Sequence, residues 1–134
     1  MPFWKCYYHI IWATKNRAPL ITKTHENILF PLVREIAHSL DTQLLAINGM
    51  PDHIHVAVSM PPKIAISQWV KQVKGKSSHE LNQHITNQDR FRWQSGFGVL
   101  TYGQKQLPYV LAYIENQKQH HQDDTTQPYL ETIE

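Results

Sequence analysis

The sequence predicts an α+β fold of the ferredoxin-like, or RRM-like, kind: an antiparallel split βαβ sheet with helices packed on one face. The first observation is the order βαββαβα, in which segments rich in β-branched and aromatic residues alternate with segments whose apolar residues recur at helical spacing. The second is that two strand-like segments follow one another between two helices, as a hairpin would. The length of 134 residues is that of one domain.

The first half of the chain carries three of the predicted strands. Residues 7–14 (YYHIIWAT) are rich in β-branched and aromatic side chains, which favours a strand. Residues 24–40 form an amphipathic helix with Thr24 as N-cap. Pro31 inside it is tolerated only if the helix kinks there or if the start of the helix is moved to that proline. Residues 43–48 and 53–60 are the hairpin strands, joined by a tight connection.

The second half contributes two helices and the last strand. Residues 64–82 form the second helix, residues 97–102 the last strand and residues 107–121 the third helix. The remaining residues, 122–134, are acidic and show no strong pattern. We therefore expect one domain over residues 1–121 and an acidic C-terminal tail.

Composition excludes several classes of protein. The net charge of +2 and the pI near 8.7 do not by themselves indicate a nucleic-acid partner. A single cysteine, Cys6, excludes an intrachain disulfide framework and fits a reducing cytoplasm. No apolar run reaches about 18 residues and the start lacks signal-peptide features, so we expect no membrane span and no signal peptide. Nine histidines and four tryptophans invite the search for a site.

The strongest local signal is Asp52-His53-Ile54-His55 in the second hairpin strand. Because strand side chains alternate, His53 and His55 point to one face while Ile54 points to the other. Two imidazoles about 7 Å apart at their backbones can converge on one metal ion. Small residues that follow on the same face leave room above them. The alternative is a pair of histidines on a partly exposed strand face.

A second signal lies on the predicted third helix. Tyr109, Tyr113, Gln117 and His121 are four residues apart and share one side of the helix. A tyrosine stripe alone is typical of the amphipathic edge of a core, but a buried amide or imidazole needs partners, which favours a site. The residues on another side, which would face the sheet, are Leu107, Leu111 and Ile114.

Three segments are candidate nucleic-acid surface. They are the second helix with its lysines, residues 90–93 (RFRW) with interleaved arginines and rings, and two cations after the first strand. Rings between cations suit stacking on single-stranded bases, although charge on a helix is usually only a solvated face. The candidate DNA-binding residues are Lys15, Arg17, Trp69, Lys71, Lys74, Lys76, Arg90, Arg92 and Trp93.

Four ordered motifs resemble a known family. They are Asp52-His53-Ile54-His55, Lys74-Gly75-Lys76-Ser77-Ser78, residues 93–99 (WQSGFGV), and Tyr113-Ile114-Glu115-Asn116-Gln117 followed by His120-His121. With this order and spacing the chain resembles the small single-tyrosine transposases of the HUH (His-hydrophobic-His) endonuclease superfamily, which serve compact bacterial insertion sequences, and their repeat-associated relatives. The resemblance covers nearly the whole chain, although Phe97 stands where a tyrosine is usual.

The resemblance implies a metal-dependent transposase that cleaves and rejoins single-stranded or hairpin DNA at insertion-sequence ends. Tyr113 would be the nucleophile and would form a 5′-phosphotyrosine intermediate with a free 3′-hydroxyl. His53, His55 and Gln117 would hold a divalent metal ion, Mg²⁺ or Mn²⁺, that polarises the scissile phosphate. Asp52 is either a residue that orients an imidazole or simply a turn former.

The resemblance also bears on assembly and location. In insertion-sequence relatives the tyrosine helix of one subunit covers the histidine face of the other, whereas repeat-associated relatives are monomers. We expect a homodimer with shared active sites, because a short polar joint over residues 103–106 precedes the helix and little chain follows it. The expected location is the bacterial cytoplasm, in association with the nucleoid.

Other function classes stay open. A catalytically silent, domesticated single-stranded nucleic-acid-binding module would keep the fold and the DNA surface. A metal-free ferredoxin-like RNA- or DNA-binding module would not need His53, His55 and Gln117 together. A phosphoesterase with two His-x-Ser/Thr motifs is disfavoured, because His79 is followed by Glu80 and Leu81.

Overall fold

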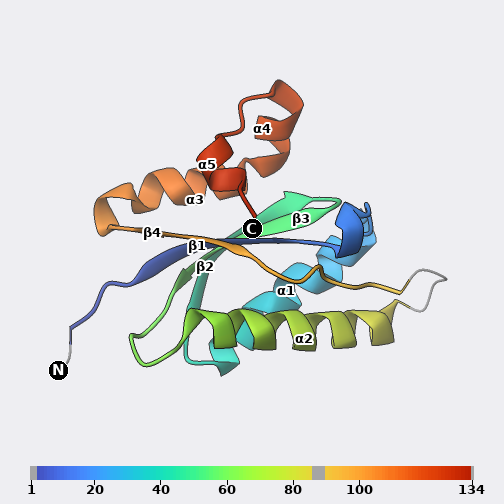
Figure 1. Cartoon of the computed structure of the whole chain (residues 1–134), viewed down its shortest axis with the longest axis horizontal. Coiled ribbons are helices and arrows are strands. Elements are labelled where there is room, and N and C mark those ends of the chain that lie inside the picture. Colours follow the sequence, from blue (N-terminus) through green and yellow to red (C-terminus); the bar gives the residue numbers. More distant parts are fainter. Residues whose placement is uncertain (1–2, 86–89, 134) are drawn as a thin grey trace.

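The computed structural model describes residues 3–85 and 90–133, and its elements follow the predicted order (Figure 1). Short 3₁₀ turns, η1 (Lys15–Arg17) and η2 (Gln104–Gln106), follow β1 and β4. The strands and helices are β1 (Tyr7–Ala13), α1 (Lys23–Ser39), β2 (Gln43–Met50), β3 (His53–Ser59), α2 (Ile66–His84), β4 (Gly98–Tyr102), α3 (Leu107–Glu115), α4 (Gln117–Asp123) and α5 (Pro128–Glu131).

The sheet is antiparallel, and its strand order is β2-β3-β1-β4, so β3 and β1 lie at its centre. This arrangement confirms the predicted α+β fold class. β2 and β3 form the predicted hairpin, which pairs Gln43 with Ser59 at one end and Met50 with His53 at the other. Gly49 is required beside the turn, because a Cβ there would overlap the backbone oxygen of His53.

Helices cover both faces of the sheet (Figure 1). α1 and α2 pack together on one face, whereas α3 contacts β2 and β3 on the opposite face. The expectation of helices on one face is therefore wrong. The physical reason is that small residues, Ala46 on β2 and Ala57 on β3, let α3 approach closely enough for Val110 and Ile114 to pack on them.

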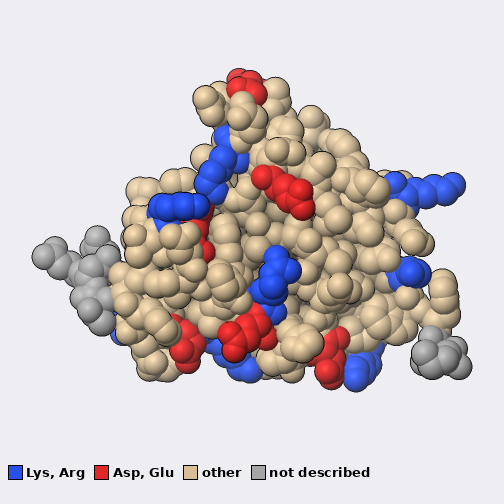
Figure 2. All heavy atoms as spheres, turned by 180° about the vertical axis from the view of Figure 1, so that it is seen from behind, with Lys and Arg blue, Asp and Glu red and all other residues tan. Residues whose placement is uncertain are grey.

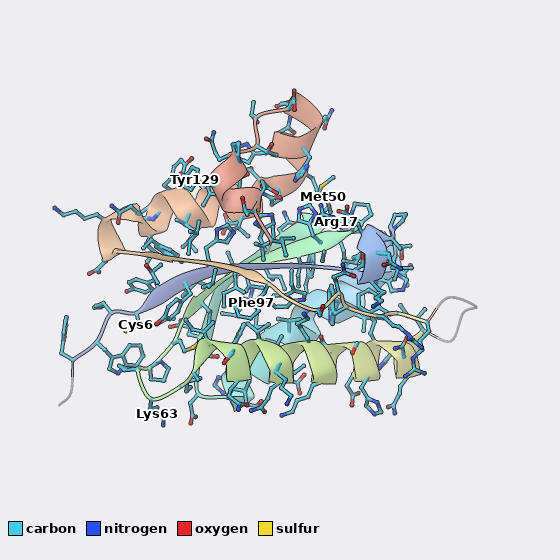
Figure 3. All side chains as sticks on the ribbon, viewed as in Figure 1. Cys6, Arg17, Met50, Lys63, Phe97 and Tyr129 are labelled. Atoms are coloured by element: carbon cyan, nitrogen blue, oxygen red, sulfur yellow. The ribbon has the colours of Figure 1, made fainter. Side chains whose placement is uncertain are left out.

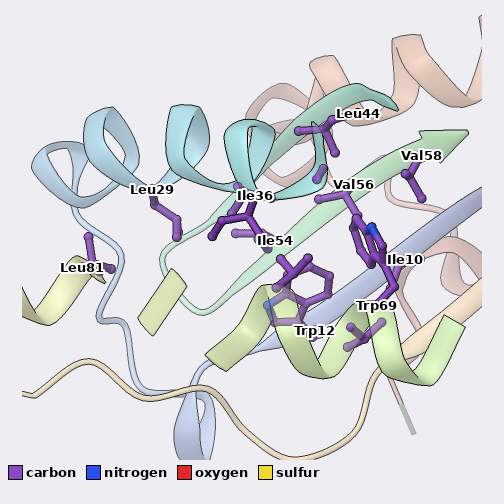
Figure 4. Packing of buried hydrophobic residues seen from close by; sticks show 14 of the residues in the cluster. Ile10, Trp12, Leu29, Ile36, Leu44, Ile54, Val56, Val58, Trp69 and Leu81 are labelled. Carbon is purple, nitrogen blue, oxygen red and sulfur yellow. The ribbon is translucent and has the colours of Figure 1, made fainter. Parts of the chain in front are cut away.

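The main core lies between the sheet and the layer formed by α1 and α2 (Figure 4). Alternate residues of the central strands project into it, among them Trp12, Ile54 and Val56, all fully buried. Trp69 of α2 meets Trp12 edge to face, with ring centroids 6.4 Å apart. The alternation that buries Ile54 and Val56 here sends the histidines of β3 to the other face.

α1 begins earlier than the sequence predicts. Its N-cap is Thr22 rather than Thr24, and the Thr22 hydroxyl accepts a hydrogen bond from the backbone N–H of His25 at 3.2 Å. Pro31 lies at an exposed position inside α1, which continues through it. Among the described residues, no helix has the length and apolar character needed to cross a bilayer.

The C-terminal part also differs from expectation. The helix predicted over residues 107–121 is interrupted at Asn116 (φ −100°, ψ 23°), where α3 gives way to α4. The tail expected to lack a pattern contains α5, which begins at Pro128. Leu130 of α5 is 4% exposed, so the tail packs against the body of the protein.

Candidate metal and tyrosine site

His53 and His55 lie on the face of β3 that α3 and the following helices cover (Figure 1). They are 2% and 0% exposed, and their ring centroids are 5.1 Å apart. Ile54 between them points into the core on the other face, as strand alternation predicts. The alternative of two histidines on a partly exposed strand face is therefore wrong, because the C-terminal helices close over them.

Asp52 fixes the orientation of His53. Its Oδ1 lies 2.7 Å from Nδ1 of His53, and its Oδ2 accepts a hydrogen bond from Nε of Arg17 at 3.2 Å. Burial alone would raise the pKa of Asp52, but the hydrogen bond and charge of His53 and the charge of Arg17 outweigh it and lower that pKa. Since a carboxylate only accepts, Nδ1 of His53 carries a hydrogen, which in a neutral ring leaves the lone pair on Nε2.

A third buried histidine, His9 on β1, supports His55. Nε2 of His9 lies 2.8 Å from Nδ1 of His55, and the two ring planes are nearly parallel, with centroids 5.0 Å apart. Burial, and then the neighbouring charge of His55, lowers the pKa of His9 to about 3, so its ring is neutral at pH 7. Burial also lowers the pKa of His55. No pattern in the sequence marks His9 as part of a site.

Glu131 of α5, which the sequence analysis missed, brings a carboxylate into the centre of the site. Its Oε1 lies 3.2 Å from Nε2 of His55, 3.5 Å from Nε2 of His53 and 3.4 Å from Nε2 of His121. Burial alone would raise the pKa of this carboxyl, but the adjacent imidazoles of His53 and His55 hold the pKa far below its usual range. Pro128 marks a helix start, yet no sequence signal distinguishes one glutamate in an acidic tail.

Tyr113 reaches the same carboxylate from α3. Its side chain is buried; its hydroxyl donates to Oε2 of Glu131 and accepts from the backbone N–H of Gln127 at 3.0 Å. The ring centroid lies 6.2 Å from that of His55. Burial, followed by the hydrogen bond to Glu131, raises the pKa of Tyr113 to about 12. The phenol therefore keeps its proton at pH 7, and attack needs a proton acceptor or a stabiliser of negative charge.

Three of the four members of the predicted helical stripe meet at this site. Gln117, fully buried, donates from Nε2 to Oε2 of Glu131 at 3.1 Å, and its Oε1 lies 3.1 Å from Nε2 of His121. Tyr113 is the third member. Tyr109, the fourth, is 52% exposed and lies outside the cluster. The buried amide has the polar partners that its burial requires.

Two imidazoles and a carboxylate at this site fit a divalent metal ion. One ligand atom from each of His53, His55 and Glu131 lies within 4.8 Å of the others. Nε2 of His53 is buried without a hydrogen-bond partner, and it faces the Glu131 carboxylate. Such an orphaned nitrogen is what a metal ion would use. Gln117, the third ligand that the resemblance implies, contacts the same carboxylate.

Five of the nine candidate DNA-binding residues line one hollow of about 620 Å³ between α2 and residues 90–95. Lys74 holds this segment in place, since its Nζ donates to the carbonyl oxygens of Gln94 and Gly96 at 2.5 and 3.0 Å. A Cβ on Gly75 would meet nothing within 4 Å, so the backbone of α2 is open to the hollow. The five residues are Lys15, Lys74, Arg90, Arg92 and Trp93.

The other four candidates lie elsewhere. Trp69 is 1% exposed and its Nε1 donates to a threonine hydroxyl in the core, so the expectation that it stacks on bases is wrong: no face of its ring is free. Lys76 lines a separate hollow between α1 and α2, and Lys71 is exposed on α2. Arg17 pairs with Asp52 beside the cluster of His53, His55 and Glu131.

Charge on the surface is mixed. In the face shown in Figure 2, lysines and arginines are interspersed with aspartates and glutamates and form no continuous basic patch. This agrees with the net charge of +2. The basic hollow beside α2 is therefore a local feature rather than part of a wholly basic face.

Comparisons with known proteins agree on one family. Residues 2–117 match the family model described as IS200-like transposase. The chain is 29% identical over 119 residues to the transposase for insertion sequence element IS200 of Salmonella typhimurium, which covers 85% of this chain and 78% of that protein. It is 27% identical over 117 residues to the ISDra2 transposase TnpA of Deinococcus radiodurans, with 82% of each covered.

Two solved structures are similar to this one. A crystal structure of a protein from Deinococcus radiodurans R1 that is described as a transposase has a TM-score of 0.70 and 29% identity, covering 87% of this chain and 93% of that chain. The structure of a REP-associated tyrosine transposase bound to a REP hairpin has a TM-score of 0.67 and 16% identity, covering 90% of this chain and 72% of that chain. At that identity, the second similarity shows the shared fold.

Proposed function

Because the chain belongs to the IS200-like transposase family, we propose that it cleaves single-stranded DNA at the ends of an insertion sequence and rejoins it through a 5′-phosphotyrosine intermediate. One observation carries the proposal. The buried hydroxyl of Tyr113 lies in one cluster with the imidazoles of His53 and His55 and the carboxylate of Glu131. This cluster combines a nucleophile, a proton acceptor and a set of metal ligands.

In the proposed cleavage step the hydroxyl oxygen of Tyr113 attacks the phosphorus of a phosphodiester. A P–O bond to Tyr113 forms and the P–O3′ bond breaks, so that one strand leaves with a free 3′-hydroxyl. Oε2 of Glu131 is the acceptor for the phenol proton, because the hydroxyl already donates to it, and the leaving 3′ oxygen takes up a proton from solvent water. The phosphotyrosine bond keeps the energy of the broken bond, so rejoining needs no ATP.

We further propose that His53, His55 and Gln117, together with Glu131, hold Mg²⁺ or Mn²⁺. Oε1 of Glu131 faces the imidazoles while its Oε2 faces Tyr113 and Gln117, so one carboxylate serves both groups. A bound ion would polarise the scissile phosphate and stabilise the charge that develops on it. Such help is needed, since the pKa of Tyr113 is about 12. Imidazole ligands favour Mn²⁺ over Mg²⁺.

The basic hollow beside α2 is the proposed surface for single-stranded or hairpin DNA. Arg90 and Arg92 supply exposed charge for phosphates, and Trp93 supplies a ring on which a base can stack. The open backbone at Gly75 supports this role, because glycine inside a helix costs about 1 kcal/mol and no contact within the described chain requires it. The similar tyrosine transposase of known structure is bound to a REP hairpin.

A homodimer in the bacterial cytoplasm, associated with the nucleoid, is the proposed assembly and location. β4 is an edge strand, and Leu100 on it and Tyr109 near it are exposed. Tyr129 on α5 is exposed beside them (Figure 3), which gives a second copy an apolar surface to cover. Within one chain Tyr113 lies beside its own His55. Shared sites would need α3 to α5 to exchange between subunits.

Such an exchange would have to release a contact that ties α4 to its own chain. Nζ of Lys118 lies 2.8 Å from Oε2 of Glu26 on α1 and donates to Oδ1 of Asn48 at 2.7 Å. Mixing the inactive chains Tyr113→Phe and His53→Ala tests the shared arrangement. Restored cleavage means that tyrosine and histidines come from different subunits; a mixture that stays inactive while subunits exchange means that they do not.

The alternative is a catalytically silent nucleic-acid-binding module. One observation favours it: Glu131 already engages the hydroxyl of Tyr113 and both imidazoles. Incubation with single-stranded hairpin DNA and Mn²⁺, followed by a denaturing gel, separates the two functions. We expect a denaturation-resistant adduct for wild type and for the control Tyr109→Phe, and none for Tyr113→Phe. Hairpin binding without any adduct would support the silent module.

A further inference from the structure

His9 contacts Nδ1 of His55 in the same way as Asp52 contacts Nδ1 of His53. The contact atoms are 2.8 Å apart in the first pair and 2.7 Å apart in the second. An imidazole that binds a metal ion through one nitrogen donates the hydrogen of its other nitrogen to a partner, which fixes the ring and strengthens the ligand. Asp52 can only accept, so the direction of its hydrogen bond with His53 is fixed, whereas His9 can either donate a hydrogen bond to His55 or accept one from it.

Glu131 sets the direction of the contact between His9 and His55 in this structure. Nε2 of His55 lies 3.2 Å from Oε1 of Glu131, and a carboxylate oxygen only accepts, so that nitrogen carries the hydrogen. A neutral ring has one N–H, so Nδ1 of His55 is an acceptor and Nε2 of His9 donates to it. Nδ1 of His9, which has no partner, is then a bare lone pair rather than a buried donor.

We propose that His9 is the positioning residue that makes His55 a metal ligand, by changing from hydrogen-bond donor to acceptor when the ion binds. This inference rests on the metal site proposed above. Coordination needs the lone pair of His55 Nε2, so the hydrogen of His55 moves to Nδ1 and requires an acceptor opposite. His9 becomes that acceptor by carrying its own hydrogen on Nδ1. Each ring keeps one hydrogen in both states.

The surroundings of His9 permit this exchange without movement of the ring. β1 pairs with β3 on one side and β4 on the other, and the plane of the His9 ring is nearly parallel to that of His55, with an interplanar angle of 16°. No hydrogen-bond partner fixes Nδ1 of His9 in one tautomer. His9 also lines a hollow of about 610 Å³ with residues of β4, α3 and α5.

Calorimetric titration with Mn²⁺ tests the role of His9 on variants of the full chain. His9→Phe keeps a flat buried ring but cannot accept, and we expect its Mn²⁺ affinity to fall 10- to 100-fold. His9→Gln offers a carbonyl oxygen as acceptor and should stay within about threefold of wild type. Ile10→Val, on the opposite face of β1, is the control and should bind as wild type does. Wild-type affinity in a folded His9→Phe would overturn the proposal.

A measurement on the wild-type chain keeps the test independent of how the variants fold. Nitrogen-15 NMR of the histidine rings with and without Mg²⁺ reports which nitrogen carries each hydrogen. We expect Nε2 of His9 to change from the N–H to the bare-nitrogen range on metal saturation, and Nδ1 to change in reverse. An unchanged His9 with metal bound overturns the role of His9 alone. Failure of wild type to bind Mn²⁺ or Mg²⁺ overturns the proposed metal site itself.

Discussion

The metal-free protein should lose stability as the pH falls below 6.5, and His9 should account for a defined share of that loss. In the unfolded chain His9 has the ordinary pKa of 6.5, whereas burial lowers its pKa to about 3 in the folded chain. Between these values the unfolded chain binds a proton that the folded chain does not, so acid favours unfolding. At about 1.4 kcal/mol per pKa unit, His9 should cost about 2 kcal/mol of unfolding free energy at pH 5 relative to pH 7.5.

Urea unfolding of the metal-free wild type and of His9→Phe at pH 7.5 and pH 5 measures this share. Wild type should lose about 2 kcal/mol more than the variant between the two pH values. His25, whose pKa burial also lowers, contributes to the loss in both proteins and cancels in the comparison. Ile10→Val removes core volume but no titrating group, so its loss should equal that of wild type. Equal losses in wild type and His9→Phe would refute the reasoning.

The remaining predictions concern the metal and the DNA. His53→Ala should abolish Mn²⁺ binding in calorimetry while the circular dichroism spectrum stays native, because the ring points away from the main core; unchanged affinity would contradict the metal site. Glu131→Gln should weaken Mn²⁺ binding by roughly tenfold or more, since a neutral amide replaces an anionic ligand; full affinity would remove Glu131 from the ligand set. Arg92→Gln should weaken DNA binding and reduce the salt slope by about 1, whereas Lys63→Gln, whose lysine pairs with an aspartate outside the hollow, should change neither. Single-stranded hairpin DNA should outcompete blunt duplex at equal salt, because stacking on Trp93 is worth about 1–3 kcal/mol per base; the reverse order would count against the stacking surface.

The sequence predicts the sheet and the histidine pair well because both depend on local periodicity. Alternation along β3 places Ile54 in the core and His53 on the other face, whatever covers that face. The same reasoning fails for His9. β1 is buried on both faces, so its residues form a nearly continuous buried run in which no period marks one histidine as different.

The helices over the histidine face could not be predicted, because periodicity shows where a side chain points but not what will cover it. Glu131 meets His55 across 76 residues of sequence, and no local pattern encodes that contact. The error at Trp69 has a different cause. A tryptophan at an apolar position of an amphipathic helix belongs to the core, and its burial with Val70 and Val73 outweighs its value as a stacking surface.

The central claim is that Tyr113 forms a covalent bond with a 5′ phosphate of DNA, and identification of the DNA-linked residue tests it most directly. The protein is incubated with single-stranded hairpin DNA and Mn²⁺, the adduct is digested with protease and nuclease, and the peptide that retains a nucleotide is fragmented in a mass spectrometer. We predict that the added nucleotide mass lies on Tyr113. Its presence on Tyr109 or on any other residue, or the lack of any nucleotide-bearing peptide, would contradict the claim.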